Sequence, residues 1–123
     1  MQVLLSIKPE FADKIFDGQK KYEYRRSIFK NKDVKKIVVY ASSPVSKVIG
    51  EFEIGEIMFD ELGKLWNKTK NNSGISKECF SSYFVNKDNG YAIKVEKSHR
   101  YRNPVCLQSK YGVSPPQSFL YLI

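Results

Sequence analysis

An uninterrupted run of β-branched and apolar residues, at positions 37–41, constrains the fold more than any other part of the sequence. Its residues, Ile-Val-Val-Tyr-Ala, indicate a strand that is buried on both faces. Short or alternating apolar patterns predict further strands at residues 4–7, 20–25, 48–54, 91–95 and 119–123. Helical spacing of apolar side chains predicts about three helices, at residues 9–17, 61–69 and 77–84. Strands at both ends, with helices early and in the middle, predict a mixed α+β barrel.

Local signals refine these elements. Pro9 opens the first predicted helix, at a position where its missing N–H does no harm, and Gly18 is expected to end it in the left-handed conformation. At Gly55 the alternation of the fourth predicted strand goes out of phase, so we expect a β-bulge there. Asp60 is expected to cap the second helix, and Asn89-Gly90 is expected to form a tight turn.

The length and composition favour one globular domain. All 123 residues fit a single domain, 1–123, because two smaller pieces could not bury useful cores unaided, and the 41% of apolar residues argues against disorder. No apolar run reaches the length of a membrane span, and the first seven residues lack the features of a signal peptide. Cys79 and Cys106 are far apart and lack metal-ligand spacing. We therefore expect a cytoplasmic protein with two free thiols, no membrane association, no metal site and no cofactor.

The net charge of +8 is unevenly distributed along the chain. Residues 8–36 hold ten Lys or Arg against five acids, and residues 94–110 hold five against one. Residues 50–63 carry five acids and no base. A chain polarised in this way can present a positive face that attracts phosphates, which suggests RNA or a nucleotide-like ligand as the partner. The alternative is a solvated lysine-rich surface without a partner.

One charged motif, Gly18-x-Lys20-x-x-Glu23-x-Arg25, falls where the first helix turns into a strand. Here the sequence resembles the ASCH family, whose fold is a PUA-like β-barrel and whose signature is this G-x-K-x-x-E-x-R pattern. Five further blocks in the same order extend the resemblance over nearly the whole chain. They are residues 4–9, residues 40–44, residues 50–52, residues 90–93 and residues 115–119.

The resemblance implies a cleft beside the helix-to-strand turn, lined by the charged motif residues and proposed to bind RNA. In that cleft Lys20 would offer an ammonium, Arg25 a planar fork for phosphate or a base edge, and Glu23 an acceptor. The further residues expected to bind ligand are Ser6, Lys8, Ser42, Ser43, Gln117 and Ser118. Lys20 and Glu23 have opposite strand parity, so both reach one cleft only through a bend, or if Lys20 precedes the regular strand. The alternative for Glu23 and Arg25 is a surface ion pair.

Aromatic residues interleave with the basic ones, and single-stranded bases can stack on such rings. The tyrosines that could act in this way are Tyr22, Tyr24, Tyr40, Tyr91 and Tyr101, although we expect packing roles for most of them. Trp66, Phe80 and Phe84 are assigned to helix packing.

The residues leave three classes of function open, of which a binding module without chemistry is favoured. A hydrolase is the main alternative, either a ribonuclease or an amidohydrolase acting on acetylated cytidine, with Lys20 and Glu23 as its catalytic residues. The amidohydrolase members of the ASCH family have a lysine that matches Lys20, but they place a threonine where this chain has Glu23. They also have a glutamate in a stretch that here is Asn71–Ile75 and holds no carboxylate, so two of three catalytic positions depart from their pattern. A nuclease stays open, because a lysine and a carboxylate near a phosphate could act as acid, base and charge stabiliser. A protein-interaction module that uses the acidic strand is the third possibility.

Overall fold

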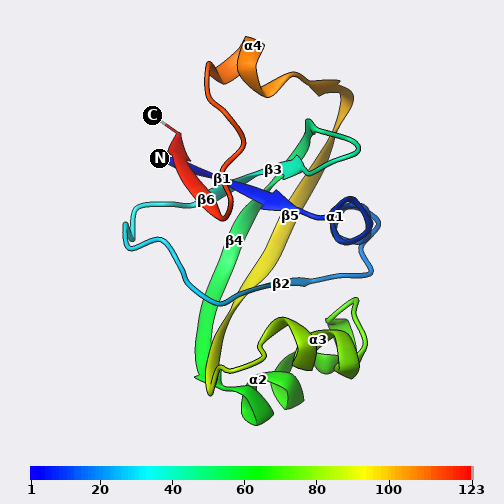
Figure 1. Ribbon diagram of the computed structural model, residues 1–123, viewed down its shortest axis with the longest axis vertical. Coiled ribbons are helices and arrows are strands. Elements are labelled where there is room, and N and C mark those ends of the chain that lie inside the picture. Colours follow the sequence, from blue (N-terminus) through cyan, green and yellow to red (C-terminus); the bar gives the residue numbers. More distant parts are fainter. Residues whose placement is uncertain (123) are drawn as a thin grey trace.

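The computed structural model describes residues 1–122, which form one six-stranded sheet with helices around it (Figure 1). The strands lie in the order β2-β5-β4-β3-β1-β6, and all neighbours are antiparallel except β1 and β3. The strands are β1 (Gln2–Ile7), β2 (Tyr22–Arg25), β3 (Lys36–Ala41), β4 (Lys47–Glu61), β5 (Asn89–Val105) and β6 (Phe119–Leu122). The helices are α1 (Pro9–Phe16), α2 (Leu62–Thr69), α3 (Lys77–Tyr83) and α4 (Leu107–Tyr111), with a 3₁₀ turn at Lys70–Asn72.

This architecture confirms the α+β class and the PUA-like mixed sheet. Among residues 1–122, the edge strands β2 and β6 are not joined by a strand ladder, so the sheet is open rather than a closed barrel. Within the same residues, no helix is both long and apolar enough to cross a membrane. The last residue of the final predicted strand, Ile123, lies outside the described residues.

Strand β3 is buried on both faces, as its unbroken apolar run predicted. Ile37 and Val39 belong to a core cluster that includes residues of α1, and Val38 and Tyr40 to a second cluster that includes Leu107 of α4. Burying apolar side chains on both sides is the main stabilising contribution to a sheet of this kind. The two faces therefore have separate cores, with β3 between them.

Strands β4 and β5 form a long two-stranded ribbon that extends beyond the rest of the sheet (Figure 1). Beyond Glu53, β4 pairs only with β5, and its register shifts between Ile54 and Ile57. This shift confirms the bulge predicted at Gly55. At the far end of the ribbon, α2 and α3 cover a third core cluster, which contains Phe80 and Phe84. The packing roles predicted for these two rings are thereby confirmed.

The turn between α1 and β2 positions the charged motif. Pro9 occupies the first turn of α1, and Gly18 adopts the predicted left-handed conformation with a φ of +82°. Lys20 follows this turn and precedes the first residue of β2, Tyr22. The opposite strand parity of Lys20 and Glu23 is therefore no obstacle, because Lys20 is not part of the regular strand.

Three local expectations differ from the structure. The short helix α4 was not predicted; its five residues end at Gly112, which has a φ of +66°. Asp60 does not cap α2, because β4 continues to Glu61, and the Asp60 carboxylate accepts hydrogen bonds from the Glu61 N–H and from Lys68 Nζ. Asn89 and Gly90 are not a turn but the first residues of β5, paired with the end of β4.

Candidate functional site

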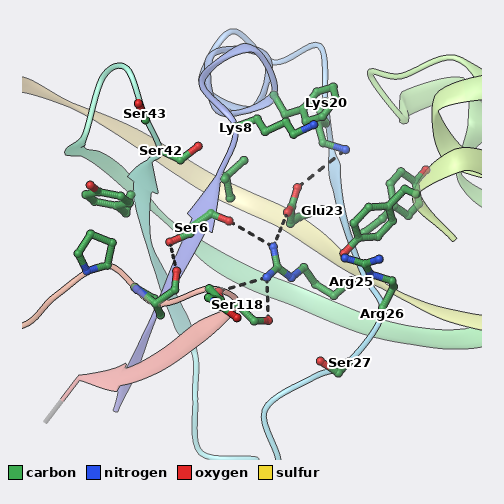
Figure 2. A pocket seen from close by; sticks show the side chains of 18 of the residues that line it. Ser6, Lys8, Lys20, Glu23, Arg25, Arg26, Ser27, Ser42, Ser43 and Ser118 are labelled. Carbon is green, nitrogen blue, oxygen red and sulfur yellow. Dashed lines mark hydrogen bonds and ion pairs between the residues drawn. The ribbon is translucent and has the colours of Figure 1, made fainter.

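A cavity of about 830 Å³ lies beside the turn between α1 and β2, and we call it the main cavity (Figure 2). Its walls come from five stretches of the chain, within residues 6–11, 20–27, 40–46, 75–83 and 115–118. All nine residues predicted to bind ligand line it: Ser6, Lys8, Lys20, Glu23, Arg25, Ser42, Ser43, Gln117 and Ser118. The structure thus brings these residues together, while their role in binding stays a prediction.

Lys20 is the most deeply buried charged residue of the cavity wall, with only 2% of its surface exposed. Its Nζ donates to the main-chain oxygen of Ser73 at 3.2 Å, lies 4.0 Å from Glu23 Oε1, and lies 4.6 Å from the centroid of the Tyr24 ring. Burial lowers the pKa of Lys20 below its ordinary value, and the nearby Glu23 carboxylate offsets part of this effect. The amine is therefore neutral more often than that of an exposed lysine.

The segment after α2 packs directly against Lys20, although it is distant in sequence. Gly74 has a φ of +69°, and an added Cβ there would lie 2.5 Å from Lys20 Cβ. Lys14 Nζ donates to the Gly74 oxygen at 3.0 Å, and Lys21 N–H donates to the Asn72 oxygen at 2.8 Å. Only a glycine permits this close approach, so the segment packs against the Lys20 side chain and holds it in place.

Glu23 lies between the two cations, as Figure 2 shows. Its Oε2 accepts a hydrogen bond from Arg25 Nη1 at 3.2 Å, and both side chains are about nine-tenths buried, with 8% and 11% exposed. The expected alternative of a surface ion pair is therefore wrong: the pair is buried and lines the cavity. Lys20, Glu23 and Arg25 together form what we call the buried charge cluster.

Arg25 also connects the opposite ends of the sheet. Its guanidinium donates to the Ser6 oxygen on β1, at 3.5 Å, and to both the oxygen and Oγ of Ser118, at 3.2 and 3.0 Å. Ser6 Oγ donates in turn to the Pro116 oxygen at 2.7 Å. These bonds fix the segment before β6 against the cavity, although β2 and β6 share no ladder.

The other four predicted residues lie at the rim. Lys8, Ser43 and Gln117 are exposed, and Ser42 is half-buried. Because they are accessible to solvent, these side chains can reorient toward a ligand more freely than the buried charge cluster can.

Several lining residues were not predicted as part of the site. Arg26 lies over the Tyr83 ring, with 4.8 Å from Cζ to the ring centroid, and both residues line the cavity. Arg26 directly follows the motif and was recognisable as basic, whereas nothing in the helical pattern around Tyr83 indicated a ligand-facing role. Of the five tyrosines considered for stacking, Tyr24 and Tyr40 line the cavity, and Tyr22, Tyr91 and Tyr101 do not.

Comparison with known proteins identifies several similar chains. Residues 5–99 match the family model described as the ASCH domain. The chain is 28% identical to the ASCH domain-containing ribonuclease of Zymomonas mobilis, over 98% of this chain and 84% of that protein. The crystal structure of ASCH from Zymomonas mobilis has a TM-score of 0.91 and 28% identity, covering 99% of this chain and 87% of that chain.

A further relative is a much longer protein. The chain is 31% identical to the large ribosomal subunit protein uL22 of Ureaplasma parvum, over 98% of this chain but only 39% of that protein. It therefore spans about two fifths of the length of this relative. The family match covers most of the chain, and it includes the motif residues Lys20, Glu23 and Arg25, which line the main cavity. This chain belongs to the ASCH domain family.

Proposed function

We propose that this protein binds single-stranded RNA, with one nucleotide seated in the main cavity. The cavity volume of about 830 Å³ falls in the range of small-molecule sites, which run from about 300 to 1,000 Å³. Its wall combines a few charged groups with apolar and aromatic surface from residues such as Phe11 and Tyr40. A nucleotide offers the matching groups, namely a phosphate, ribose hydroxyls and a flat base.

The observation that carries the proposal is the charge of the buried cluster. When Lys20 is protonated, two cations, Lys20 and Arg25, share one carboxylate, Glu23, so the cluster then bears a net positive charge in a poorly solvated position. An uncompensated buried charge is costly, and an anion entering the cavity would reduce that cost. A phosphate group carries the required negative charge and accepts hydrogen bonds from both side chains.

The rim supports the same ligand class. Arg26 is exposed beside the cavity and lies on the Tyr83 ring, so it can contact a phosphate or a base at the entrance. Serine hydroxyls from two other segments, including Ser42 and Ser43, can donate to or accept from ribose and base edges. The similar Zymomonas mobilis protein is named a ribonuclease, and a ribonuclease has to bind RNA.

The test measures binding of a labelled single-stranded RNA by fluorescence anisotropy at several salt concentrations. Wild type is expected to bind, with an affinity that falls as salt rises, because neutralised phosphates release counterions. Lys20→Met should weaken binding about tenfold or more, because a hydrogen bond to a charged group contributes about 1.5–3 kcal/mol. Arg26→Gln should weaken it too, without altering the buried charge cluster.

The matched control is Lys77→Met, since Lys77 is exposed on α3 and outside the main cavity. It removes the same charge and should bind RNA like wild type. Equal binding by the Lys20, Arg26 and Lys77 variants would refute the proposed site, and absence of binding by wild type at low salt would refute the proposed ligand. Melting curves of each variant establish that the protein is folded.

Cleavage of the bound RNA is a second candidate function, and the lowered pKa of Lys20 favours it. A neutral amine can accept the proton of a ribose 2′-hydroxyl as that oxygen attacks the adjacent phosphorus and the bond to the 5′ oxygen breaks. The products are a 2′,3′-cyclic phosphate and a 5′-hydroxyl, whose oxygen takes its proton from solvent. Arg25 would stabilise the charge that develops on the phosphate. An amidohydrolase has less support, because no hydroxyl side chain is present at position 23 and segment 71–75 offers Lys20 a main-chain oxygen in place of a carboxylate.

Turnover of labelled RNA tests this second function. If Lys20 acts as the base, the cleavage rate should rise with pH, with an inflection below the ordinary lysine value of 10.5. Lys20→Met should remove both the inflection and the turnover, while Lys77→Met, purified in the same way, keeps both. Unchanged turnover in Lys20→Met would show that the cleavage comes from another group or from a contaminant.

A further inference from the structure

A row of side chains leads from the buried charge cluster across the sheet to the β4–β5 ribbon. Arg25 on β2 is the register partner of Tyr91 on β5, and Tyr91 is the partner of Phe59 on β4. Register partners on neighbouring strands point to the same face of a sheet. Because strands lie about 4.8 Å apart, the row extends about 10 Å from the wall of the main cavity.

The far end of this row is an exposed aromatic surface. Phe59 is 58% exposed, and its ring lies 4.6 Å from that of Tyr91 with an angle of 44° between the planes. Ile57, two residues earlier on β4, is 40% exposed. Single exposed apolar residues are ordinary, but an exposed aromatic ring in line with a polar cavity is a surface on which a flat group can stack.

A second cavity, of about 610 Å³, lies next to this aromatic surface. It lies open to solvent between residues 28–35 and the bulged part of β4, Ile54–Ile57. Figure 1 shows the segment after β2 crossing the β4–β5 ribbon. Consecutive residues line the two cavities: Arg26 and Ser27 line the main cavity, and the next residue, Ile28, lines the second.

The second cavity is positively charged, and its outer wall is held in place. Three lysines, Lys30, Lys32 and Lys35, line it against a single acid, Glu56. The N–H groups of residues 30 and 31 both donate to the Tyr121 hydroxyl at 3.0 Å, and the Ile54 N–H donates to the oxygen of residue 35 at 2.9 Å. The lysines are therefore presented from a segment that is tied to β6 and to β4.

We propose that this surface is a second RNA subsite, where a base of the strand leaving the main cavity stacks on Phe59 and the loop lysines contact its phosphates. The inference rests on the proposed function and extends it from one nucleotide to a short single strand. Base stacking and phosphate contacts together are how proteins bind single strands without reading their sequence. The excess of lysines favours a polyanion over an apolar peptide or a second copy of the chain.

The test compares two labelled RNAs of the same composition, a dinucleotide and a strand of about eight nucleotides, a length within the range of single-strand sites. Phe59→Ala should weaken binding of the longer strand about tenfold and leave the dinucleotide unchanged, because only the longer strand reaches the second subsite. Phe59→Trp, which keeps an aromatic face, should bind the longer strand at least as tightly as wild type. Val85→Ala is the matched control, since Val85 is 60% exposed and lines neither cavity.

The lysines are tested through the salt dependence of binding. Replacing Lys30 and Lys32 together with glutamine should flatten the salt dependence for the longer strand by roughly 0.7 per lost phosphate contact, and leave that of the dinucleotide unchanged. Lys77→Gln should leave both unchanged.

Each outcome bears on a separate claim. If wild type binds both RNAs and Phe59→Ala binds the longer strand equally well, the second subsite is wrong and the main-cavity proposal stands. If wild type binds neither RNA, the proposed function is wrong and the second subsite with it. If Phe59→Ala changes the oligomeric state measured by sedimentation and leaves RNA binding unchanged, the surface is a contact between copies and the inference is overturned.

Discussion

Replacing Gly74 with alanine tests whether the segment after α2 holds Lys20 in place. Gly74 has a φ of +69°, and an alanine Cβ would lie 2.5 Å from Lys20 Cβ and 2.9 Å from Lys20 Cα. The substitution therefore has two destabilising effects. The backbone adopts a conformation that is unfavourable for alanine, and the new methyl group overlaps a buried residue that has little room to move.

Gly112→Ala separates the backbone effect from the steric overlap. Gly112 has nearly the same φ, +66°, and nothing lies within 4 Å of the position of an added Cβ. Its substitution should cost about 1–2 kcal/mol from the left-handed backbone alone. Gly74→Ala should cost that amount and a further 1–3 kcal/mol, roughly the penalty of overpacking a core.

Thermal unfolding of the two variants measures the difference. With an unfolding entropy of about 2.1 cal/mol/K per residue, a chain of 123 residues shifts its melting temperature by about 4 °C per kcal/mol. Gly74→Ala should therefore melt about 4–12 °C below Gly112→Ala. It should also bind RNA more weakly, since the Lys20 side chain is displaced, while Gly112→Ala binds like wild type. Equal melting temperatures and equal binding would show that the segment yields freely and does not position Lys20.

Three further predictions concern groups outside this contact. Tyr24→Phe removes the hydrogen bond from Tyr24 to Thr69 Oγ1, 2.7 Å long, and should lower the free energy of unfolding in urea by about 1 kcal/mol. Burial raises the pKa of Tyr24 from 10.0 to about 12, so its contribution to stability is present below pH 10 and lost between about pH 10 and 12; alkaline unfolding of Tyr24→Phe should lack that loss. Glu51→Ala leaves the half-buried Tyr101 hydroxyl without its acceptor at 2.8 Å and should cost about 1 kcal/mol in urea. Glu53→Ala, whose lysine partner is 78% exposed, should be nearly neutral; similar losses in both variants would contradict the assignment.

The elements that the sequence predicted correctly are those determined by neighbouring residues. The apolar run at 37–41 needs no distant information to indicate burial on both faces, and Gly18 needs only the helix before it. Where tertiary contacts compete, local rules failed: Asp60 is a good cap residue, but pairing with β5 keeps it in the strand. The short helix α4 has too few residues for a periodic pattern to be visible.

The candidate site was predictable only in part, for the same reason. The motif and the family blocks identified residues that all line one cavity, because short motifs record which side chains occur together. The contact of Lys20 with Ser73, 53 positions away, and the contact of Arg26 with Tyr83 depend on how the helices pack. No spacing rule connects residues so distant. The burial of Glu23 with Arg25 likewise depends on α1 and on the segment before β6 covering them.

Residues 62–88, which include α2 and α3, form an insertion that begins and ends at adjacent points of the ribbon, since Glu61 and Asn89 are register partners. The β4–β5 ribbon would thus close as a hairpin even if residues 62–88 were replaced by a short turn. Yet this insertion supplies Ile75 and Tyr83 to one wall of the main cavity, and the remaining walls come from segments outside it. During evolution, that wall can be exchanged or reshaped without altering the order or register of the strands. Homologues with the same sheet can therefore diverge in which ligand they bind by varying this one insertion.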